Sequence, residues 1–200
     1  MKKSKEKAKN LRRKTVLHIL TGSIAAYRAG DLIQDLREEG ARVVCVMTPS
    51  AKQFVTPLVL RALSGERVYD DFFALDTPYD VLHTSLAEEA DIILVAPASA
   101  DFMAKLAGGF ADDLASCIIL AARRPVIIVP AMNDQMYQHP MTQENIRKLK
   151  SIGCRFVEPV EGRLVCGKEA IGHISDSHSI IRAVRSCLGS SSLKRNVPKR

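Results

Sequence analysis

Residues 92–130 read IILVAPASADFMAKLAGGFADDLASCIILAARRPVIIVP, and this stretch decides the fold class. Two continuous apolar runs, Ile92–Ala96 and Val126–Val129, enclose two segments with helical periodicity, Ala100–Ala107 and Leu114–Ala122. Apolar runs that do not alternate with polar residues are typical of strands covered by helices on both faces. We therefore expect parallel strands connected through helices in this stretch.

The same alternation continues on both sides of this stretch. Further strands are expected at Val16–Leu20, Val43–Met47 and Arg155–Val157, and further helices at Ala25–Glu38, Ala51–Leu63 and Thr142–Ser151. The predicted fold class is α/β, a single doubly wound, Rossmann-like parallel sheet with helices on both faces. We expect it to occupy residues 15–188, between basic, disordered tails at 1–14 and 189–200.

Composition and charge agree with a single globular domain. The 200 residues are 46% hydrophobic, which is ordinary for such a domain. The formal net charge is +7, but residues 1–14 carry +7 and residues 189–200 carry +4, which leaves about −4 for the predicted domain. Nucleic-acid binding is not expected, because the chain has no tryptophan and no interleaving of aromatic and basic residues.

Membrane insertion and secretion are not expected either. No apolar run approaches the roughly 18 residues that span a bilayer, and the basic N-terminus leads into a short apolar stretch without a small-residue cleavage site. The five cysteines form no C-x-x-C pair, which favours reduced thiols and a cytoplasmic location. The sequence contains no cluster of cysteine and histidine residues, so we expect no metal site.

Ligands of a doubly wound sheet bind outside the carboxyl ends of its strands. Small and hydroxyl-bearing residues follow four of the predicted strands, at Thr21–Ser23, Thr48–Ser50, 97–101 and 130–133. Thr21-Gly22-Ser23 opens a predicted helix and suits a mononucleotide phosphate, although a helix cap with a turn glycine explains it equally well. It does not match the dinucleotide pattern G-x-G-x-x-G.

Three further residues are candidates for chemistry. Asn133 follows a buried strand between two methionines, and is either a ligand contact or a turn former. Cys166 lies in a glycine-containing polar segment, as a reactive or an incidental thiol. His83 is expected in a loop before the helical segment that contains Leu86, with a structural role or a role in proton transfer.

Taken together, residues 21–57 and 83–145 resemble the homo-oligomeric flavin-containing cysteine decarboxylases. The resemblance covers about residues 15–176 and includes the string Pro-Ala-Met-Asn at 130–133. LVCGKEAIGH at 164–173 resembles the substrate-clamp loop of the branch that acts on phosphopantothenoylcysteine.

The resemblance implies an FMN cofactor and a set of site residues. His83, Asn133 and Cys166 match catalytic positions: the histidine assists proton removal, the asparagine binds the substrate carboxylate and the cysteine donates a late proton. Met136 and Lys168 are implied as further substrate contacts. The implied FMN-binding residues are Gly22, Ser23, Ile24, Thr48, Ser50, Phe54, Ser99, Ala100, Asp101, Phe102, Ser116 and Ala131.

The resemblance also implies the reaction and the assembly. The flavin oxidises the thiol end of the cysteine to a thioaldehyde, loss of CO2 leaves an enethiolate, and return of the electrons with a proton yields phosphopantetheine. Active sites are expected between subunits of a trimer, and trimers often assemble into dodecamers. Because the chain ends near residue 200, we expect it to lack the synthetase domain fused to many bacterial relatives.

Alternatives and departures accompany this interpretation. Decarboxylation of a C-terminal peptidyl cysteine is disfavoured by Cys166, and a non-catalytic flavin-binding regulatory protein is disfavoured by the three matched catalytic residues. Flavin prenyltransferases share the fold but lack Pro-Ala-Met-Asn with a clamp cysteine. Four residues differ from those that are usual in the family. Asp101 replaces an asparagine, Tyr137 a tryptophan, Ala170 a glycine and His173 an arginine.

Overall fold

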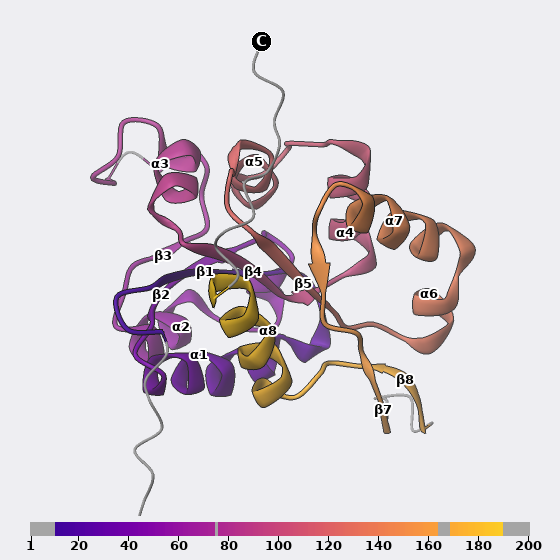
Figure 1. Ribbon diagram of the computed structural model, residues 1–200. Coiled ribbons are helices and arrows are strands. Elements are labelled where there is room, and N and C mark those ends of the chain that lie inside the picture. The colour runs from indigo at the N-terminus through magenta and orange to yellow at the C-terminus, as the bar shows by residue number, and fades with distance from the viewer. Residues whose placement is uncertain (1–10, 75, 164–168, 190–200) are drawn as a thin grey trace, which may run out of the picture.

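The computed structural model describes residues 11–74, 76–163 and 169–189, and a six-stranded parallel sheet lies at its centre (Figure 1). The strands follow the order β3-β2-β1-β4-β5-β6. Their bounds are Thr15–Leu20 for β1, Arg42–Met47 for β2, Val68–Tyr69 for β3, Ile92–Ala98 for β4, Val126–Pro130 for β5 and Arg155–Phe156 for β6. The predicted doubly wound fold class is confirmed.

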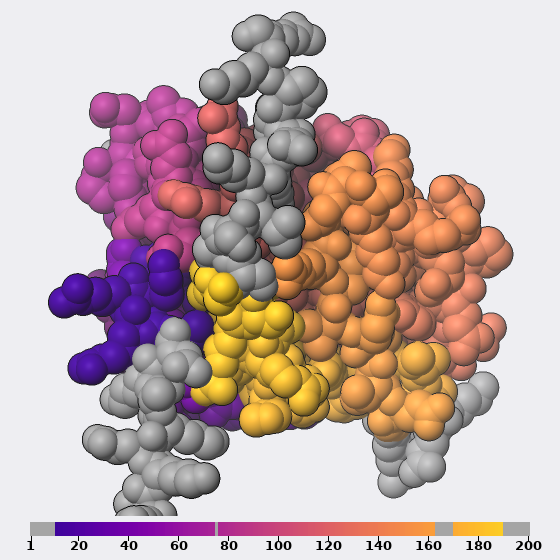
Figure 2. All heavy atoms as spheres, viewed as in Figure 1, coloured from indigo at the N-terminus to yellow at the C-terminus, as the bar shows by residue number. Residues whose placement is uncertain are grey.

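Helices cover both faces of this sheet (Figure 1). One face carries α1 (Ala29–Glu38), α2 (Pro57–Ser64) and α8 (Ser177–Gly189), and the other carries α3 (Leu82–Glu89), α4 (Ala100–Gly108), α5 (Leu114–Ala121) and α7 (Pro140–Ser151). In the space-filling view, α8 (yellow) lies between the N-terminal segment (indigo) and the region of α6 and α7 (orange) (Figure 2). None of the helices in the described residues is both long and apolar enough to cross a membrane.

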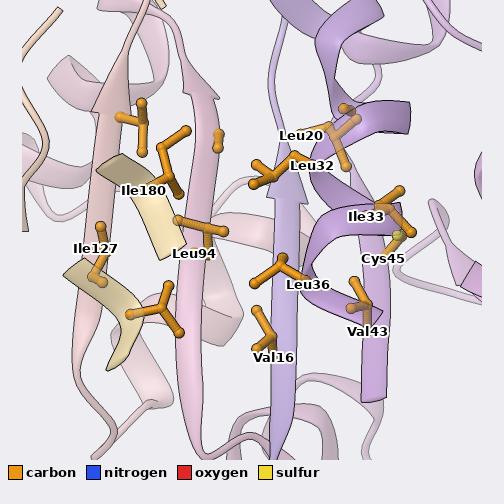
Figure 3. Close-up of a cluster of buried hydrophobic side chains, with 14 of the residues drawn as sticks. Val16, Leu20, Leu32, Ile33, Leu36, Val43, Cys45, Leu94, Ile127 and Ile180 are labelled. Carbon is orange, nitrogen blue, oxygen red and sulfur yellow. The ribbon is translucent and has the colours of Figure 1, made fainter. Parts of the chain in front are cut away.

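The two layers of helices bury two hydrophobic clusters, one on each face of the sheet. Val16 of β1 lies near Leu36 of α1 and Leu20 lies beside Leu32, and Ile180 of α8 belongs to the same cluster (Figure 3). Leu17, between Val16 and Leu20 in sequence, belongs to the opposite cluster. Successive strand residues therefore face different buried layers, which explains the continuous apolar runs. Full burial of each such side chain stabilises the fold by roughly 1.5–3 kcal/mol.

The chain changes direction within the sheet between β1 and β4. From β1 it proceeds outward through β2 to β3, and it then returns to β4 and proceeds through β5 to β6 on the other side. In sheets of this kind, the loops after the two central strands separate and leave a crevice at the carboxyl edge. This crevice is where the topology places a ligand.

Two predicted helices differ from those observed. The prediction of one helix over Ala51–Leu63 is wrong: a short 3-10 helix, η2 (Ala51–Gln53), precedes α2. Thr56 is extended and caps α2 through its hydroxyl, and proline at position 57 disfavours helical geometry in the residue before it. The helix predicted from Ala25 begins instead as a 3-10 helix, η1 (Ile24–Arg28), before α1.

A β-hairpin that the sequence did not predict lies beside the sheet. Its antiparallel strands are β7 (Val160–Arg163) and β8 (Glu169–His173), and the short helix α6 (Asp134–Gln138) lies next to β8 (Figure 1). Both strands contain glycine and charged residues and show no apolar run. The sequence of this hairpin therefore contains no hydrophobic periodicity from which its two strands could be predicted.

Candidate functional site

Buried hydroxyl groups connect the segments that follow β1, β4 and β5. The Thr21 Oγ1 donates to the Pro97 carbonyl at 2.8 Å and accepts from the Ser99 amide at 2.8 Å. The Ser23 Oγ donates to the Ala131 carbonyl at 2.9 Å, and the Ala131 amide donates to the Ala98 carbonyl at 3.1 Å. We call residues 21–23, 96–99 and 131 the strand-end platform. Its bonds satisfy polar groups that would be costly to bury alone, so they fix the platform backbone.

His18 supports the platform from inside the sheet. Its Nε2 donates to the Ala96 carbonyl at 2.7 Å, beside the point where the pairing of β4 with β5 shifts in register and where the Ala96–Pro97 peptide is cis. The imidazole is fully buried, and this burial lowers the pKa of His18 to about 4, although the bond to Ala96 acts in the opposite direction. His18 is therefore neutral at physiological pH, with its proton on Nε2.

Gly22 brings the loop after β1 against the loop after β2. A Cβ atom added at this position would lie 2.5 Å from the Cβ of Ser50, closer than side-chain atoms can approach. Glycine is therefore required here by packing. The bare backbone also allows a ligand to approach closely.

The first cavity has a volume of about 490 Å³ and lies between the platform, α6 and β8. It contains nine of the predicted site residues: Gly22, Ser23, Ile24, Phe54, Ser99, Ala100, Ala131, Asn133 and Met136. Its remaining lining comes from Ala25, Tyr27, Met132, Gly172, His173 and Ile174. Met132 belongs to the predicted strand-end segment 130–133, and Gly172 and His173 belong to the clamp-like string 164–173, whereas no pattern indicated Ala25, Tyr27 or Ile174 as site residues.

A second cavity, of about 370 Å³, adjoins the first through Gly22, Ser99, Ala100 and Met136, which line both. It contains the other predicted residues from the loops after β2 and β4, namely Thr48, Ser50, Asp101 and Phe102. Its wall is more polar than that of the first cavity, with hydroxyl groups, the N-terminus of α4 and an ion pair between Lys105 and Asp112 at 2.8 Å. The two cavities form an apolar compartment next to a polar one.

Asn133 lines the first cavity from the start of α6. Its Oδ1 accepts a hydrogen bond from the Gln135 amide at 2.9 Å and so caps α6. The carboxamide NH2 is then the group that remains to donate to a ligand. Tyr137, on the same helix, donates through its hydroxyl to Glu158 at 2.6 Å, and Gln143 donates to the Tyr137 carbonyl at 2.6 Å. These bonds fix α6, and with it Asn133.

The hairpin supplies the facing wall through Gly172. Its carbonyl accepts from the Met132 amide at 3.1 Å. The backbone of Gly172 has a φ of +135°, and an added Cβ would lie 2.2 Å from the Met132 carbonyl oxygen. Only glycine permits this approach, and the contact places His173 in the cavity wall.

His83 lies in a different part of the molecule. The expectation of a loop was wrong, because His83 is the second residue of α3, whose neighbouring Leu82 and Leu86 are buried in the core. It lines neither cavity. Its ring stacks on Phe72, with a centroid distance of 5.5 Å and an interplanar angle of 18°. One chain alone therefore does not bring His83 to Asn133.

Three other predicted residues lie either outside both cavities or outside the described residues. Ser116 lines neither cavity, and its hydroxyl forms the capping box of α5 with Asp113, at 2.8 Å. Its assignment to cofactor binding stays a prediction. Cys166 and Lys168 lie outside the described residues.

The architecture and the site define a class of protein. A doubly wound sheet with small residues at its switch point, a polar compartment at a helix N-terminus and an adjoining apolar compartment suits a mononucleotide cofactor with a planar ring. The chain belongs to the Flavoprotein family, whose model matches residues 4–189. The cofactor of this chain is accordingly a flavin.

Two curated relatives are similar over most of this chain. A probable phosphopantothenoylcysteine decarboxylase of Streptococcus mutans is 42% identical over 173 residues, covering 86% of this chain and 97% of that protein. The coenzyme A biosynthesis bifunctional protein CoaBC of Bacillus subtilis is 43% identical over 172 residues, again 86% of this chain. The chain spans 42% of the length of that bifunctional relative.

Solved structures agree with these relatives. A mutant PPC decarboxylase complexed with pantothenoylaminoethenethiol superposes with a TM-score of 0.82 at 32% identity, covering 90% of this chain and all of that one. The FMN binding protein AtHal3 superposes with a TM-score of 0.78 at 32% identity, covering 92% of this chain and all of that one.

Proposed function

We propose that this chain is an FMN-dependent decarboxylase that converts phosphopantothenoylcysteine to phosphopantetheine. The observation that carries the proposal is the Asn133 amide in the wall of an apolar cavity beside the strand-end platform. The site is built to present donor groups and a planar hydrophobic space to a ligand that ends in a carboxylate. The similarity to a probable phosphopantothenoylcysteine decarboxylase over 97% of that protein's length supports this substrate.

The two compartments fit FMN. The bare backbone at Gly22, together with Ser99 and Ala100, would border the flavin where the cavities join. Thr48, Ser50 and the free amides at the start of α4 would donate to its phosphate. When bound, FMN supplies reversible two-electron oxidation of the substrate's thiol end, which makes loss of CO2 from the neighbouring carbon favourable.

The protein side chains orient the substrate and move protons. The Asn133 NH2 would donate to the substrate carboxylate, while Ile24, Tyr27 and Phe54 exclude water from the apolar compartment. His83 would remove a proton from the substrate, and Cys166 would return one to the product. Asp101 places a carboxylate in the polar compartment, so we expect weaker phosphate binding than an asparagine there would give.

The position of His83 supports a site shared between chains. Three apolar side chains that line the first cavity are strongly exposed, Ile24 (55%), Tyr27 (63%) and Phe54 (45%), and so are Leu58 (74%) and Val59 (47%) in the first turn of α2. Exposed apolar residues that gather in this way mark an interaction surface. We propose that a second copy covers them and brings its His83 to the cavity, in a trimer that can assemble further into a dodecamer.

Turnover of phosphopantothenoylcysteine tests the reaction directly. The purified protein should release CO2 and form phosphopantetheine, whereas Cys166→Ser should form the enethiol, which is lighter by two hydrogens. Asn133→Asp keeps the oxygen that caps α6 but replaces the donor NH2 by an anion facing the substrate carboxylate. We expect it to lower kcat/KM by about 100-fold or more, with Gln138→Glu on the exposed end of α6 as the control.

A flavin-bound protein that releases no CO2 would contradict the assignment and favour a regulatory flavoprotein. Turnover of a peptide ending in cysteine, in preference to phosphopantothenoylcysteine, would assign the chain instead to the peptidyl-cysteine branch. One solved member of that branch, the peptidyl-cysteine decarboxylase EpiD, superposes with a TM-score of 0.75 at 26% identity.

Mixing two inactive variants tests the shared site. If His83 and Asn133 of one site come from different chains, equal amounts of His83→Asn and Asn133→Asp, unfolded and refolded together, should regain about a quarter of the wild-type activity, since about a quarter of sites then receive both intact residues. Each variant alone should stay inactive. Activity that stays absent in proven mixed oligomers would place both residues in one chain.

A further inference from the structure

The backbone of His83 is fixed, so only its ring needs orientation. His83 lies in the first turn of α3, between Leu82, which is 7% exposed, and the segment leading to Leu86, which is 1% exposed. The Thr84 hydroxyl donates to the Val81 carbonyl at 2.9 Å and secures the same turn. Anchored at this turn, the imidazole retains freedom about its two side-chain torsions alone.

Within the described part of the chain, no hydrogen bond is formed by either ring nitrogen of His83. A histidine that transfers protons is usually oriented by a carboxylate or a carbonyl bonded to one nitrogen. Here the contact that defines the ring plane is the stacking on Phe72, with centroids 5.5 Å apart and the planes inclined by 18°. This geometry lies within the range of favourable offset stacking, and it leaves both nitrogens available.

Phe72 is itself held in place. It packs against the hydrophobic cluster that includes Leu86, and its ring meets the edge of Phe73 at 5.0 Å. The Phe73 amide donates to the Asp71 carboxylate at 2.9 Å, which fixes the turn that carries both rings. Phe73 is 79% exposed. Phe72 thus connects the core to the imidazole, while its neighbour faces solvent.

We propose that Phe72 is a positioning residue that sets the plane of the His83 imidazole for proton transfer. This inference rests on the proposed function, because it assigns His83 a role in that reaction. The stacked ring restricts rotation about the final side-chain torsion of His83 without occupying either nitrogen. The imidazole therefore reaches a substrate in a defined orientation while both nitrogens can exchange protons.

Substitutions at Phe72 and Phe73 separate positioning from general stability. Phe72→Ala removes the stacked face, and we expect kcat to fall about tenfold with KM nearly unchanged, because misorientation of a catalytic group slows turnover more than it weakens binding. Phe72→Tyr keeps the face and should retain most of the wild-type kcat. Phe73→Ala removes the exposed neighbour but leaves Phe72 packed on the core, and it should lower kcat clearly less than Phe72→Ala. Equal losses in both alanine variants, or a rise in KM alone, would overturn the inference.

A spectroscopic measurement tests the stacking independently of activity. In protein labelled with 13C at the imidazole Cε1 position, the His83 resonance is identified by its loss in His83→Gln. Stacking should shift its proton upfield in wild type and in Phe72→Tyr, and this shift should disappear in Phe72→Ala. If the wild type shows no turnover, the proposed function fails while this shift still reports the stacking. An unchanged resonance in Phe72→Ala would overturn the inference in either case.

Discussion

The strand-end platform and the segment around His83 hold their functional groups by different means. The platform is joined by buried hydrogen bonds between Thr21, Ser23 and the backbone after β4 and β5. His83 is oriented by an aromatic contact with Phe72, which lies in the segment before α3 where Arg67 and Asp76 form an exposed ion pair. Buried hydrogen bonds are directional and costly to break, whereas offset stacking sets the plane of a ring but lets the ring slide within that plane. The comparison indicates that one chain alone fixes the strand-end platform more firmly than it fixes the orientation of the His83 ring.

The largest effect is expected from breaking the platform at Gly22. Gly22→Ala would force a Cβ atom to within 2.5 Å of the Ser50 Cβ, so one of the two loops must move. We expect a loss of about 3 kcal/mol in the free energy of unfolding and a marked loss of bound flavin. Urea unfolding and the flavin absorbance of the purified protein measure these changes.

Gly189→Ala is the matched control for this variant, since an added Cβ there meets no atom within 4 Å. It should behave like wild type. A stable Gly22→Ala protein with a full flavin content would show that the two loops can separate, and that the platform is less rigid than its hydrogen bonds indicate.

A slightly smaller loss is expected when the platform loses one hydroxyl. Thr21→Val keeps the shape of the side chain but leaves the Pro97 carbonyl and the Ser99 amide without their partner. The expected loss is about 2–3 kcal/mol in the free energy of unfolding. Thr84→Val, at an exposed hydroxyl on α3, should cost clearly less. Equal losses in the two variants would remove the distinction between the platform and the His83 segment.

A pH titration of stability tests the support that His18 gives to the platform. Because burial lowers the pKa of His18 to about 4 from an ordinary 6.5, the unfolded chain binds more protons than the folded one between these values. Stability should therefore fall as the pH falls from 6.5 toward 4, by up to about 2 kcal/mol between pH 6.5 and 5 from this group.

His18→Gln should flatten this dependence, and His178→Gln, at an exposed position, should leave it unchanged. Urea unfolding at several pH values above 5 measures the slope. Glu89 and Asp91 have pKa values held below their ordinary range despite partial burial, Glu89 by hydrogen bonds from Tyr79 and Arg42 and Asp91 mainly by its bond from Lys14. Their contribution is lost at lower pH, outside this window. An unchanged slope in His18→Gln would contradict the assignment.

The smallest effect is expected from the exposed ion pair between Arg67 and Asp76, in the chain segment that precedes α3. Arg67 meets Asp76 at 2.7 Å and lowers the pKa of that carboxyl, but Asp76 is fully exposed to solvent and salt. Asp76→Asn should leave the midpoint of thermal unfolding unchanged within experimental error. A decrease as large as that of Thr21→Val would show that the segment is held as firmly as the platform.

The sequence predicted the sheet because each central strand is buried on both faces. It failed where the local pattern carried no such signal, at the break before Pro57 and in the polar β7–β8 hairpin. It also predicted the strand-end segments that line both cavities, because strand ends converge in this topology. Four further lining residues were implied only by the family resemblance, namely Ile24, Phe54, Phe102 and Met136. The sequence could not predict that the hydroxyl of Ser23 would bond to Ala131, 108 residues away, nor that Phe72 would stack on His83. Such contacts depend on three-dimensional proximity alone.

The contact between Gly172 and Met132 has a consequence for divergence. Their hydrogen bond joins one main-chain group to another, and main-chain groups are the same in every residue except proline. Selection to retain the hairpin in its place therefore acts on position 172, where only glycine fits, and leaves the side chain of the next residue unconstrained by this bond. His173 can accordingly be exchanged during evolution while the hairpin stays attached. The side chain that this cavity wall presents to a ligand can thus change while the fold is retained.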